Sequence, residues 1–438
     1  MENKTLKREI SLMGALSTVM GTVIGAGVFF KAAAVVAHTQ SAGLALFAWL
    51  LAGFLTICGG LTVAELATAI PKTGGAIQYI EVTYGKLPAF LLGWAQSIIY
   101  FPANIAALSI IFATQFINLL RLSNGLLIPV AIATAMSVTI INLLGTRVAA
   151  RVQFFTLIVK LLPIFVIVLV GLFTPGEVTV SLVNLEIGGD KSWLAGFSGA
   201  LLATLFAYDG WLNVGNVAGE MKNPVKDLPK AIILGLSFVT LIYWGINFVF
   251  LKMLPVEQIA GNLNASSEVA SILFGTIGGK LITIGILISV YGALNGYTMT
   301  GIRVPYALAM QNDFRFSPYL TKLTRRTYVP MLPTILQLGI GCGMILIGSF
   351  DLLTDMLVFV MWFFSILIFA AVFILRKTQP DLARPYKVPL YPITPLIAMI
   401  GGLFILIMTT ITQPVLVLAG IGMTILGIPV YYYGKKKK

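Results

Sequence analysis

Two stretches of weakened helix inside long apolar runs are the features of this sequence best suited to binding a small molecule. Residues 20–28 contain Gly21, Gly25 and Gly27 halfway along a run long enough to cross a bilayer. A glycine costs about 1 kcal/mol relative to alanine inside a helix, so this stretch favours unwinding. Unwound backbone at membrane depth is tolerated only where protein buries it or where it lines a water-filled cavity. The stretch therefore predicts a cavity at the bilayer midplane.

A second interruption, Phe-Ala-Tyr-Asp-Gly-Trp at residues 206–211, lies inside another apolar run. Paired interruptions in the two halves of a membrane chain point to the binding site of a transporter. Exposed N–H groups and the positive end of a half-helix near Gly25 and Gly27 suit a carboxylate. Free carbonyls of a half-helix ending near Asp209 suit an ammonium group. Together the interruptions predict a clamp for the backbone of an amino acid; the alternative is that they are packing glycines and a tolerated kink.

The candidate substrate-binding residues share a place in these two interruptions. They are Thr22, which supplies a hydroxyl, and Val23, Ile24, Gly25, Ala26, Gly27, Phe206, Ala207 and Asp209. Glycine and alanine dominate this set and Asp209 is its only charge, so a small neutral side chain is favoured over an acidic or basic one. Phe206 is also a candidate gate over the substrate, the alternative being plain packing of an aromatic ring.

Lys160 is a basic residue deep inside an apolar run. It follows Arg151 by nine residues, which at 1.5 Å per residue places it about 13 Å into the membrane. A lysine there costs about 2.5–3.5 kcal/mol on insertion, so it is expected to face the bundle interior and to have a partner. Thr156 and Pro163 lie on the same helical face, which is typical of an inward stripe. The alternative is a lysine that snorkels to the membrane surface.

Small residues recur at helical spacing in the apolar run at residues 276–310. Gly285, Ser289, Gly292 and Gly296 follow at intervals of four, three and four, a pattern that lets another helix approach closely. Simple helix packing explains the pattern. A second interpretation is that Ser289 also offers its hydroxyl to a cation lying against this seam.

The composition places these elements in a membrane. Of 438 residues, 58% are hydrophobic and only 10% are charged, which is too little polar surface for a soluble domain. Cys58 and Cys342 both fall inside apolar runs, so we expect neither a disulfide framework nor a metal site. Twelve spans are predicted, near residues 10–36, 42–70, 87–118, 126–145, 152–174, 193–218, 231–253, 276–310, 332–349, 352–376, 393–412 and 415–433.

The distribution of basic residues predicts the orientation. With the N-terminus in the cytoplasm, 23 lysines and arginines fall in inner segments and five in outer ones, in agreement with the positive-inside rule. The five outer residues are Lys31, Arg121, Lys191, Lys252 and Lys280. Both termini are therefore expected in the cytoplasm. The net charge of +13 is explained by this asymmetry, so no nucleic-acid partner is expected.

Five stretches carry a resemblance to a known family. They are residues 21–29 (GTVIGAGVF), 59–80 (GGLTVAELATAIPKTGGAIQYI), 205–232 (LFAYDGWLNVGNVAGEMKNPVKDLPKAI), 289–303 (SVYGALNGYTMTGIR) and 384–395 (RPYKVPLYPITP). In combination they resemble the amino acid, polyamine and organocation transporters, and among these the L-amino-acid transporter group.

The resemblance implies an all-helical membrane fold of twelve transmembrane helices. Five plus five spans form an inverted repeat, the LeuT-type fold, with the first and sixth spans broken and two helices appended. Residues 1–433 would form one transmembrane domain. The first repeat is expected at about 10–174, the second at about 193–376 and the appended helices at about 393–433. Residues 434–438 would form a basic cytoplasmic tail.

The resemblance also implies roles for the two interruptions. By position, residues 21–27 match the break that binds the substrate carboxylate, and residues 206–210 match the break that binds its ammonium group. Phe206 matches the gate position. Alternating access would move the first, second, sixth and seventh spans against the third, fourth, eighth and ninth.

A tethered cation is the other implied feature. Lys160 matches a fifth-span lysine that, in this group, takes the place of a sodium ion between the first and eighth spans, where Gly21 and Ser289 lie. Tyr243 matches a tyrosine linked to the same region. A permanent charge at this place would make sodium coupling unnecessary, and exchange is then the simplest transport cycle.

We therefore predict sodium-independent exchange of small neutral L-amino acids, of the alanine, serine, threonine and cysteine class, across the cytoplasmic membrane. The expected partners are these substrates and membrane lipid. No cofactor, metal or catalytic residue is expected. The loop near residues 119–125 lacks the cysteine that joins animal members of the group to a glycoprotein heavy chain, so no disulfide-linked subunit is expected.

Three alternatives remain open. A proton-coupled carrier, or a carrier of cationic amino acids or polyamines, would need Lys160 to titrate or Asp209 to face the substrate. A membrane enzyme would need paired carboxylates, metal ligands or a nucleophile with its base, none of which the sequence presents. A channel would need the rings of repeated charge that a selectivity filter uses.

Overall fold

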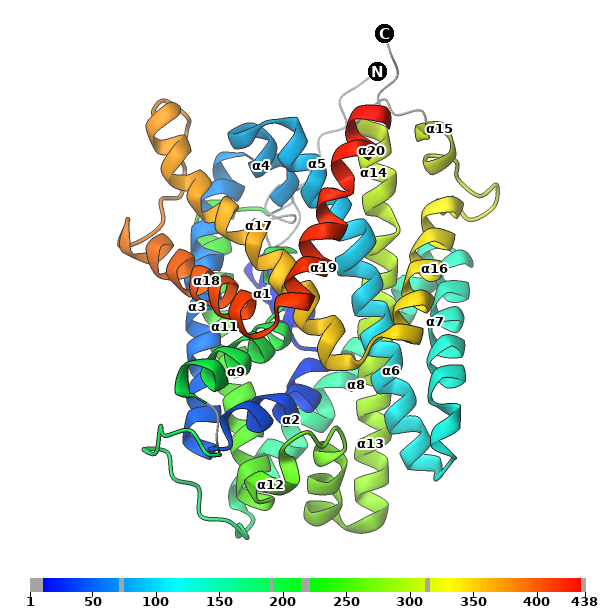
Figure 1. The fold of residues 1–438 in the computed structure, drawn as a ribbon, viewed down its shortest axis with the longest axis vertical. Helices are drawn as coiled ribbons and strands as arrows, with labels where there is room; N and C mark the ends of the chain where they lie inside the picture. The colour runs from blue at the N-terminus through cyan, green and yellow to red at the C-terminus, as the bar shows by residue number, and fades with distance from the viewer. Residues whose placement is uncertain (1–10, 71–74, 190–191, 214–220, 312–315, 435–438) are drawn as a thin grey trace.

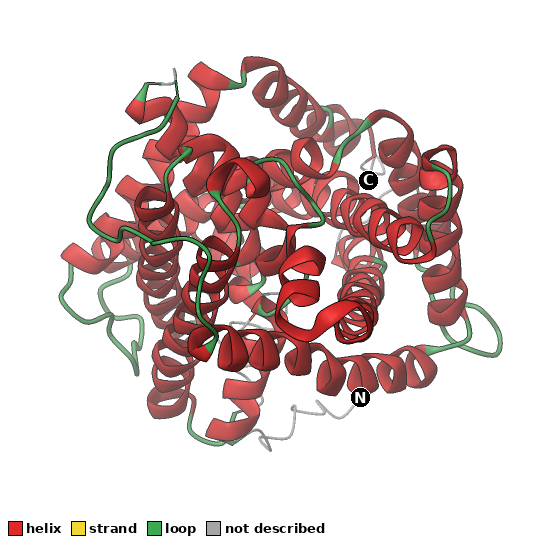
Figure 2. Ribbon diagram, turned by 90° about the horizontal axis from the view of Figure 1, so that it is seen from below, coloured by secondary structure: helices red, strands yellow, loops and turns green. Residues whose placement is uncertain are grey.

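Helices make up the regular structure of the chain. The computed structural model describes residues 11–70, 75–189, 192–213, 221–311 and 316–434. Within these ranges every regular element is helical, apart from one isolated bridge between Leu323 and Pro330 (Figure 2). A helix satisfies its own backbone hydrogen bonds, which is the requirement for crossing lipid.

Nine helices of the described part are long and apolar enough to cross a bilayer. They are α3 (Ala42–Ala69), the continuous run of α5, η1 and α6 (Lys86–Ala95, Gln96–Tyr100 and Phe101–Leu120), η2 with α7 (Asn124–Leu126 and Leu127–Leu143), α8 (Thr146–Phe173), α11 (Pro224–Met253), α13 with α14 (Ala265–Gly301 and Arg303–Gln311), α17 (Phe350–Thr378), α18 (Ile393–Thr412), and α19 with α20 (Pro414–Ile425 and Gly427–Gly434).

Shorter helices complete the described structure. Four of them are apolar: α1 (Leu12–Val23), α2 (Gly27–Thr39), α9 (Trp193–Ala207) and α16 (Met331–Ile347). The remaining short elements are α4 (Ala76–Tyr84), η3 (Trp211–Asn213), α12 (Val256–Ile259) and α15 (Ser317–Leu320). The helices α2 and α12 lie toward one end of the bundle, called the α12 end below, and α14, α15 and α20 toward the other (Figure 1).

The two predicted interruptions are breaks in the structure. The helix α1 ends at Val23, Ile24 is extended (φ −67°, ψ 109°), and α2 begins at Gly27. The helix α9 ends at Ala207 and is followed by a turn in which Gly210 has φ 99°, a backbone conformation that favours glycine. Glycine therefore contributes to both breaks, the one between α1 and α2 and the one after α9.

Two of the predicted spans coincide with helices that are kinked or broken. The helix α13 begins at Ala265 and has a kink at Gly275, where φ is 69°, so the predicted span at 276–310 begins directly after the kink. The first turn of α13 contains the polar residues Ser266, Ser267 and Glu268, so the helix begins before the apolar run does. The predicted span at 193–218 begins with α9 at Trp193 and is helical as far as Ala207, where the predicted interruption at 206–211 lies; residues 214–220 lie outside the described part of the chain.

The small-residue seam of α13 packs along α8, as its spacing predicts. A Cβ atom on Gly292 would lie 2.3 Å from Oγ1 of Thr156, and one on Gly285 would lie 2.7 Å from Cγ of Pro163. No side chain larger than hydrogen fits such a contact without movement. The seam therefore fixes α8, and with it Lys160, against α13.

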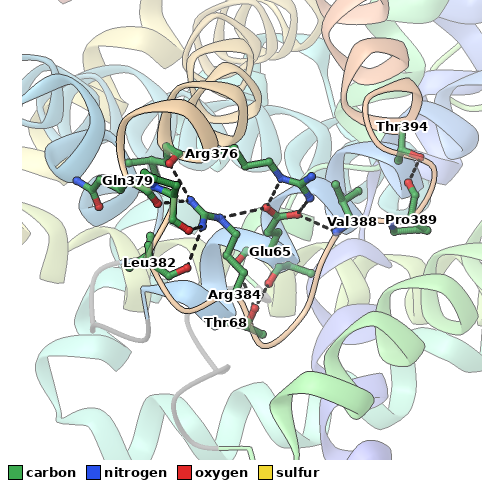
Figure 3. Close-up of polar contacts among 12 residues, drawn as sticks. Glu65, Thr68, Arg376, Gln379, Leu382, Arg384, Val388, Pro389 and Thr394 are labelled. Atoms are coloured by element: carbon green, nitrogen blue, oxygen red, sulfur yellow. Dashed lines mark hydrogen bonds and ion pairs between the residues drawn. The ribbon is translucent and has the colours of Figure 1, made fainter.

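A buried carboxylate ties α3 to α17 and to the loop that follows α17 (Figure 3). Arg376 donates two hydrogen bonds to Glu65, from Nε to Oε1 at 2.8 Å and from a terminal nitrogen to Oε2 at 2.6 Å. The backbone N–H of Val388 donates to Oε2 at 2.8 Å, and Nε of Arg384 lies 3.7 Å from Oε1. One acidic side chain thus contacts both the end of α17 and two residues of the loop that follows it, Arg384 and Val388.

The placement of Lys31 in an outer segment was wrong. Lys31 lies in α2 and is fully buried, because Asp351 and Asp355 of α17 supply the opposite charge inside the protein. Of the other residues assigned to outer segments, Lys191 lies outside the described part of the chain. Lys252 donates hydrogen bonds to carbonyl oxygens at the end of α8, including that of Thr174 at 2.7 Å.

Candidate functional site

A cavity of about 270 Å³ lies between the two helix breaks. Its lining from the first break is Gly21, Val23, Ile24, Gly25, Ala26 and Gly27, and its lining from the second is Phe206, Ala207, Asp209 and Gly210. Lys160 of α8 and Tyr297 of α13 also line it. Among the described residues that line the cavity, Lys160 is the only base and Asp209 the only acid.

The structure therefore gathers nearly all of the predicted substrate-binding residues around one cavity. Thr22 belongs to the last turn of α1, and its side chain lies outside the described part of the structure. Ser289 and Tyr243 do not line the cavity. The hydroxyl of Ser289 is buried and has no hydrogen-bond partner among the described residues.

The two breaks are in direct contact. A Cβ atom on Gly27 would lie 2.7 Å from the Cα atom of Ala207, so only glycine lets the two backbones approach this closely. Tyr243 of α11 bridges the same place, because its hydroxyl donates to the carbonyl oxygens of Val23 (2.9 Å) and Ala207 (3.2 Å). The end of α1 and the end of α9 are thus joined through one buried side chain.

Lys160 closes the carbonyl end of α1. Its Nζ atom donates hydrogen bonds to the carbonyl oxygens of Gly21 and Ile24, both at 2.6 Å, and the side chain is buried. The last carbonyls of a helix have no partner within it and carry the negative end of the helix dipole. An ammonium group satisfies both demands. Lys160 therefore stabilises a break that would otherwise leave buried carbonyl groups without partners.

The start of α2 and the end of α9 both border the cavity, and they carry partial charges of opposite sign. The helix α2 begins at Gly27, so its unpaired N–H groups and the positive end of its dipole border the cavity. The carbonyl end of α9 and the carboxylate of Asp209 border the same cavity. A molecule with an anionic and a cationic group close together fits this arrangement.

Two tyrosines that the sequence analysis missed hold Asp209. The hydroxyls of Tyr100 and Tyr297 both donate to Oδ2 of Asp209, the second at 3.1 Å. Tyr100 lies in the π-helical turn η1, and Tyr297 follows Gly296 of the seam. A signal was present in the sequence, because a tyrosine buried in a membrane core needs a partner for its hydroxyl.

Phe206 covers one side of the cavity. Its side chain is buried and meets the edge of Phe350 of α17, with 5.8 Å between ring centroids and an interplanar angle of 89°. The ammonium group of Lys31 lies 5.5 Å from the centroid of the Phe206 ring. Phe206 thus has the cavity on one side and a charged cluster on the other.

Comparison with known proteins gives one family for nearly the whole chain. The family model described as "Amino acid permease" matches residues 10–430. The chain is 42% identical over 438 residues to the serine/threonine exchanger SteT of Bacillus subtilis (strain 168), which covers 100% of this chain and 99% of that protein.

Animal transporters are similar at lower identity. The human cystine/glutamate transporter is 28% identical over 435 residues, covering 98% of this chain and 86% of that protein. The mouse Asc-type amino acid transporter 1 is 29% identical over 450 residues, covering 99% of this chain and 82% of that protein.

Proposed function

Because the chain belongs to the amino acid permease family, we propose that it is a sodium-independent exchanger of small neutral L-amino acids, of the alanine, serine, threonine and cysteine class. It is a membrane transporter and not an enzyme. Similarity to a serine/threonine exchanger over the full length of both chains supports this class of substrate.

The observation that carries the proposal is the meeting of two helix breaks at one cavity, with Lys160 bound to the carbonyls of the first. In the proposed complex the substrate carboxylate lies at the start of α2, near Gly25 and Gly27, and the ammonium group lies at the end of α9. Each charged group then leaves water for a helix end of opposite sign. The side chain of the substrate is left free to point into the rest of the cavity.

The size of the cavity supports a small side chain. Ligand cavities in proteins measure about 300–1,000 Å³, and this one, at about 270 Å³, lies just below that range. Glycine and alanine supply six of the ten residues that line it from the two breaks: Gly21, Gly25, Ala26, Gly27, Ala207 and Gly210. A bulky side chain would have to displace Phe206 or the breaks themselves.

The position of Lys160 supports the absence of sodium coupling. Its ammonium group already occupies the carbonyl oxygens of Gly21 and Ile24, which are the kind of ligand a sodium ion would use. Because Lys160 is part of α8, its positive charge stays with the protein and is not transported together with the substrate. The exchange cycle then draws its driving force from the two amino acid gradients alone.

We also propose the complete membrane topology. The nine long helices become twelve spans if α1 with α2, α9 with the segment that follows it, and α16 each contribute one. The two broken spans would occupy matching places in two inverted repeats, at about 10–174 and 193–376, followed by the appended helices at about 393–433. In this topology both termini are in the cytoplasm and the α12 end is outside, which the excess of basic residues in the inner segments supports.

One observation favours a second function. Asp209 lines the cavity, which is the arrangement that a carrier of cationic amino acids or polyamines, or a proton-coupled carrier, would need. Against this, both tyrosine hydroxyls donate to the same carboxylate oxygen, and Lys160 brings a positive charge to the same cavity. The neutral substrate remains the better match to this balanced pair of charges.

The test is exchange by the purified protein in liposomes. Labelled L-serine should enter only liposomes that contain unlabelled L-serine or L-alanine, and unlabelled L-alanine, L-threonine and L-cysteine should compete, whereas L-lysine and putrescine should not. Competition by L-lysine or putrescine, or uptake into empty liposomes along a pH gradient, would establish the second function instead.

A further inference from the structure

A buried lysine with two carboxylate partners lies on the α12 side of the cavity. Nζ of Lys31 is 2.8 Å from Oδ1 of Asp351 and 3.2 Å from Oδ1 of Asp355, and no part of the lysine side chain is exposed. Asp355 is almost fully buried, whereas about half of the Asp351 side chain is exposed. A charged group is kept inside a protein only when partners offset its loss of water, and Lys31 has two.

The same ammonium group faces two aromatic rings. Nζ of Lys31 lies 5.5 Å from the ring centroid of Phe206 and 5.1 Å from that of Phe350, and these rings meet edge to face. Both distances are within the range of a cation–π interaction, which is strongest where water is excluded. The ammonium group of Lys31 in α2 therefore contacts both α9 and α17.

Lys31 and Phe206 both lie close to the helix ends that border the cavity. Lys31 lies four residues after Gly27, the start of α2, and Phe206 lies one residue before the end of α9. Beyond Lys31, α2 contacts the α12 region, where the N–H of Gly261 donates to the carbonyl of Ala33 at 3.0 Å. The contacts of Lys31 with α9 and α17 are thus made beside the cavity, on the part of α2 that leads to the α12 region.

We propose that Lys31 is a positioning residue for the gate: held by Asp351 and Asp355, its ammonium group keeps the ring of Phe206 over the cavity. Opening toward the α12 end separates α2 from α17, which breaks the ion pairs and removes the cation from the Phe206 ring in one step. Closure of α2 against α17 is thereby coupled to retention of the substrate under the Phe206 ring. This inference rests on the proposed function, in which Phe206 covers a bound amino acid.

The test combines Lys31 and Phe206 in a double-mutant cycle, read as the KM for L-serine exchange. Lys31→Met is expected to raise KM about tenfold, the size of a lost cation–π contact at a dry site. Lys31→Arg keeps the charge and should restore KM to about twofold of the wild-type value. In a Phe206→Leu background Lys31→Met should add less than about twofold, because the ring that Lys31 positions is already gone. Equal effects in both backgrounds, or none in either, would overturn the proposal.

Folding is kept separate by two further variants. Lys31→Met removes the positive charge that pairs with both carboxylates, so the triple variant with Asp351→Asn and Asp355→Asn removes all three charges together. It should raise KM as Lys31→Met does, and an unchanged KM would contradict a gate role. Lys252→Met is the matched control, because this lysine binds only carbonyl oxygens at the end of α8 among the described residues; its KM should stay unchanged.

A readout without substrate separates this inference from the proposed function. Ala293 lines the cavity, so Ala293→Cys in a chain carrying Cys58→Ala and Cys342→Ala offers a single thiol there. Labelling of intact cells by a membrane-impermeant maleimide should be about tenfold faster with Lys31→Met, and unchanged with Lys31→Arg or Lys252→Met. Equal labelling in all four chains would overturn the gate role, even if the protein exchanges L-serine. Faster labelling with Lys31→Met in a protein that does not exchange L-serine would refute only the proposed function.

Discussion

Nζ of Lys160 donates a hydrogen bond of 2.6 Å to the carbonyl oxygen of Gly21, across 139 residues of sequence. With a second bond of the same length to Ile24, this contact places a fixed positive charge at the end of α1. The break in the first apolar run is therefore held open by a side chain from α8. The same break provides the start of α2, where the proposed substrate carboxylate binds.

Replacing Lys160 with alanine should slow L-serine exchange by at least about tenfold, because buried carbonyl groups lose a charged donor. The helices should remain folded, since the seam between α8 and α13 is untouched. Exchange rates and thermal unfolding in detergent measure the two effects. Wild-type exchange by this variant would show that Lys160 has only a structural role.

Replacing Phe206 with leucine should raise the KM for L-serine about five- to tenfold, the size typical of one lost aromatic contact. Leucine keeps most of the buried apolar area, so the unfolding temperature should change little. The matched control is Phe363→Leu, because this ring on α17 is half-exposed and does not line the cavity. An equal rise in KM in both variants would remove the gate role of Phe206.

Replacing Gly27 with alanine should abolish exchange. The new Cβ would lie 2.7 Å from Cα and 3.0 Å from Cβ of Ala207, so the two breaks would be forced apart. Gly339→Ala on α16 adds the same methyl group in open space and should leave exchange unchanged. If the Gly27 variant exchanges L-serine normally, the close contact of the breaks is not required for binding.

Replacing Glu65 with alanine should destabilise the protein by about 3 kcal/mol, because two arginines lose a buried partner and the loop after α17 loses an anchor. The loss should appear as a lower unfolding temperature in detergent. Glu257→Ala, at an exposed position of α12, provides the control and should have no effect. A Glu65 variant as stable as the control would mean that the loop is held by other contacts.

The sequence was sufficient for features that depend on local backbone chemistry. Glycines in an apolar run predict a break whatever surrounds them, which is why the ends of α1 and α9 were predicted correctly. The seam of α13 follows from helical spacing alone, and the burial of Lys160 follows from its place within an apolar helix. In each case one segment carries the whole signal.

Features that depend on contacts between distant segments could not be predicted in this way. Lys31 has the charge of an outer-loop residue, and only its ion pairs with Asp351 and Asp355, 320 and 324 residues away, make it a core residue. Tyr100 and Tyr297 likewise gain their place at the cavity from a shared partner, Asp209, on a third segment. Pairing of this kind is a property of the packed bundle.

The most direct test of the central claim is uptake of labelled L-serine into liposomes with and without internal L-serine, each in sodium buffer and in sodium-free buffer. The account predicts uptake that requires internal amino acid and is the same in both buffers, because Lys160 already holds the carbonyls of Gly21 and Ile24. Uptake into empty liposomes that depends on a sodium gradient would contradict it.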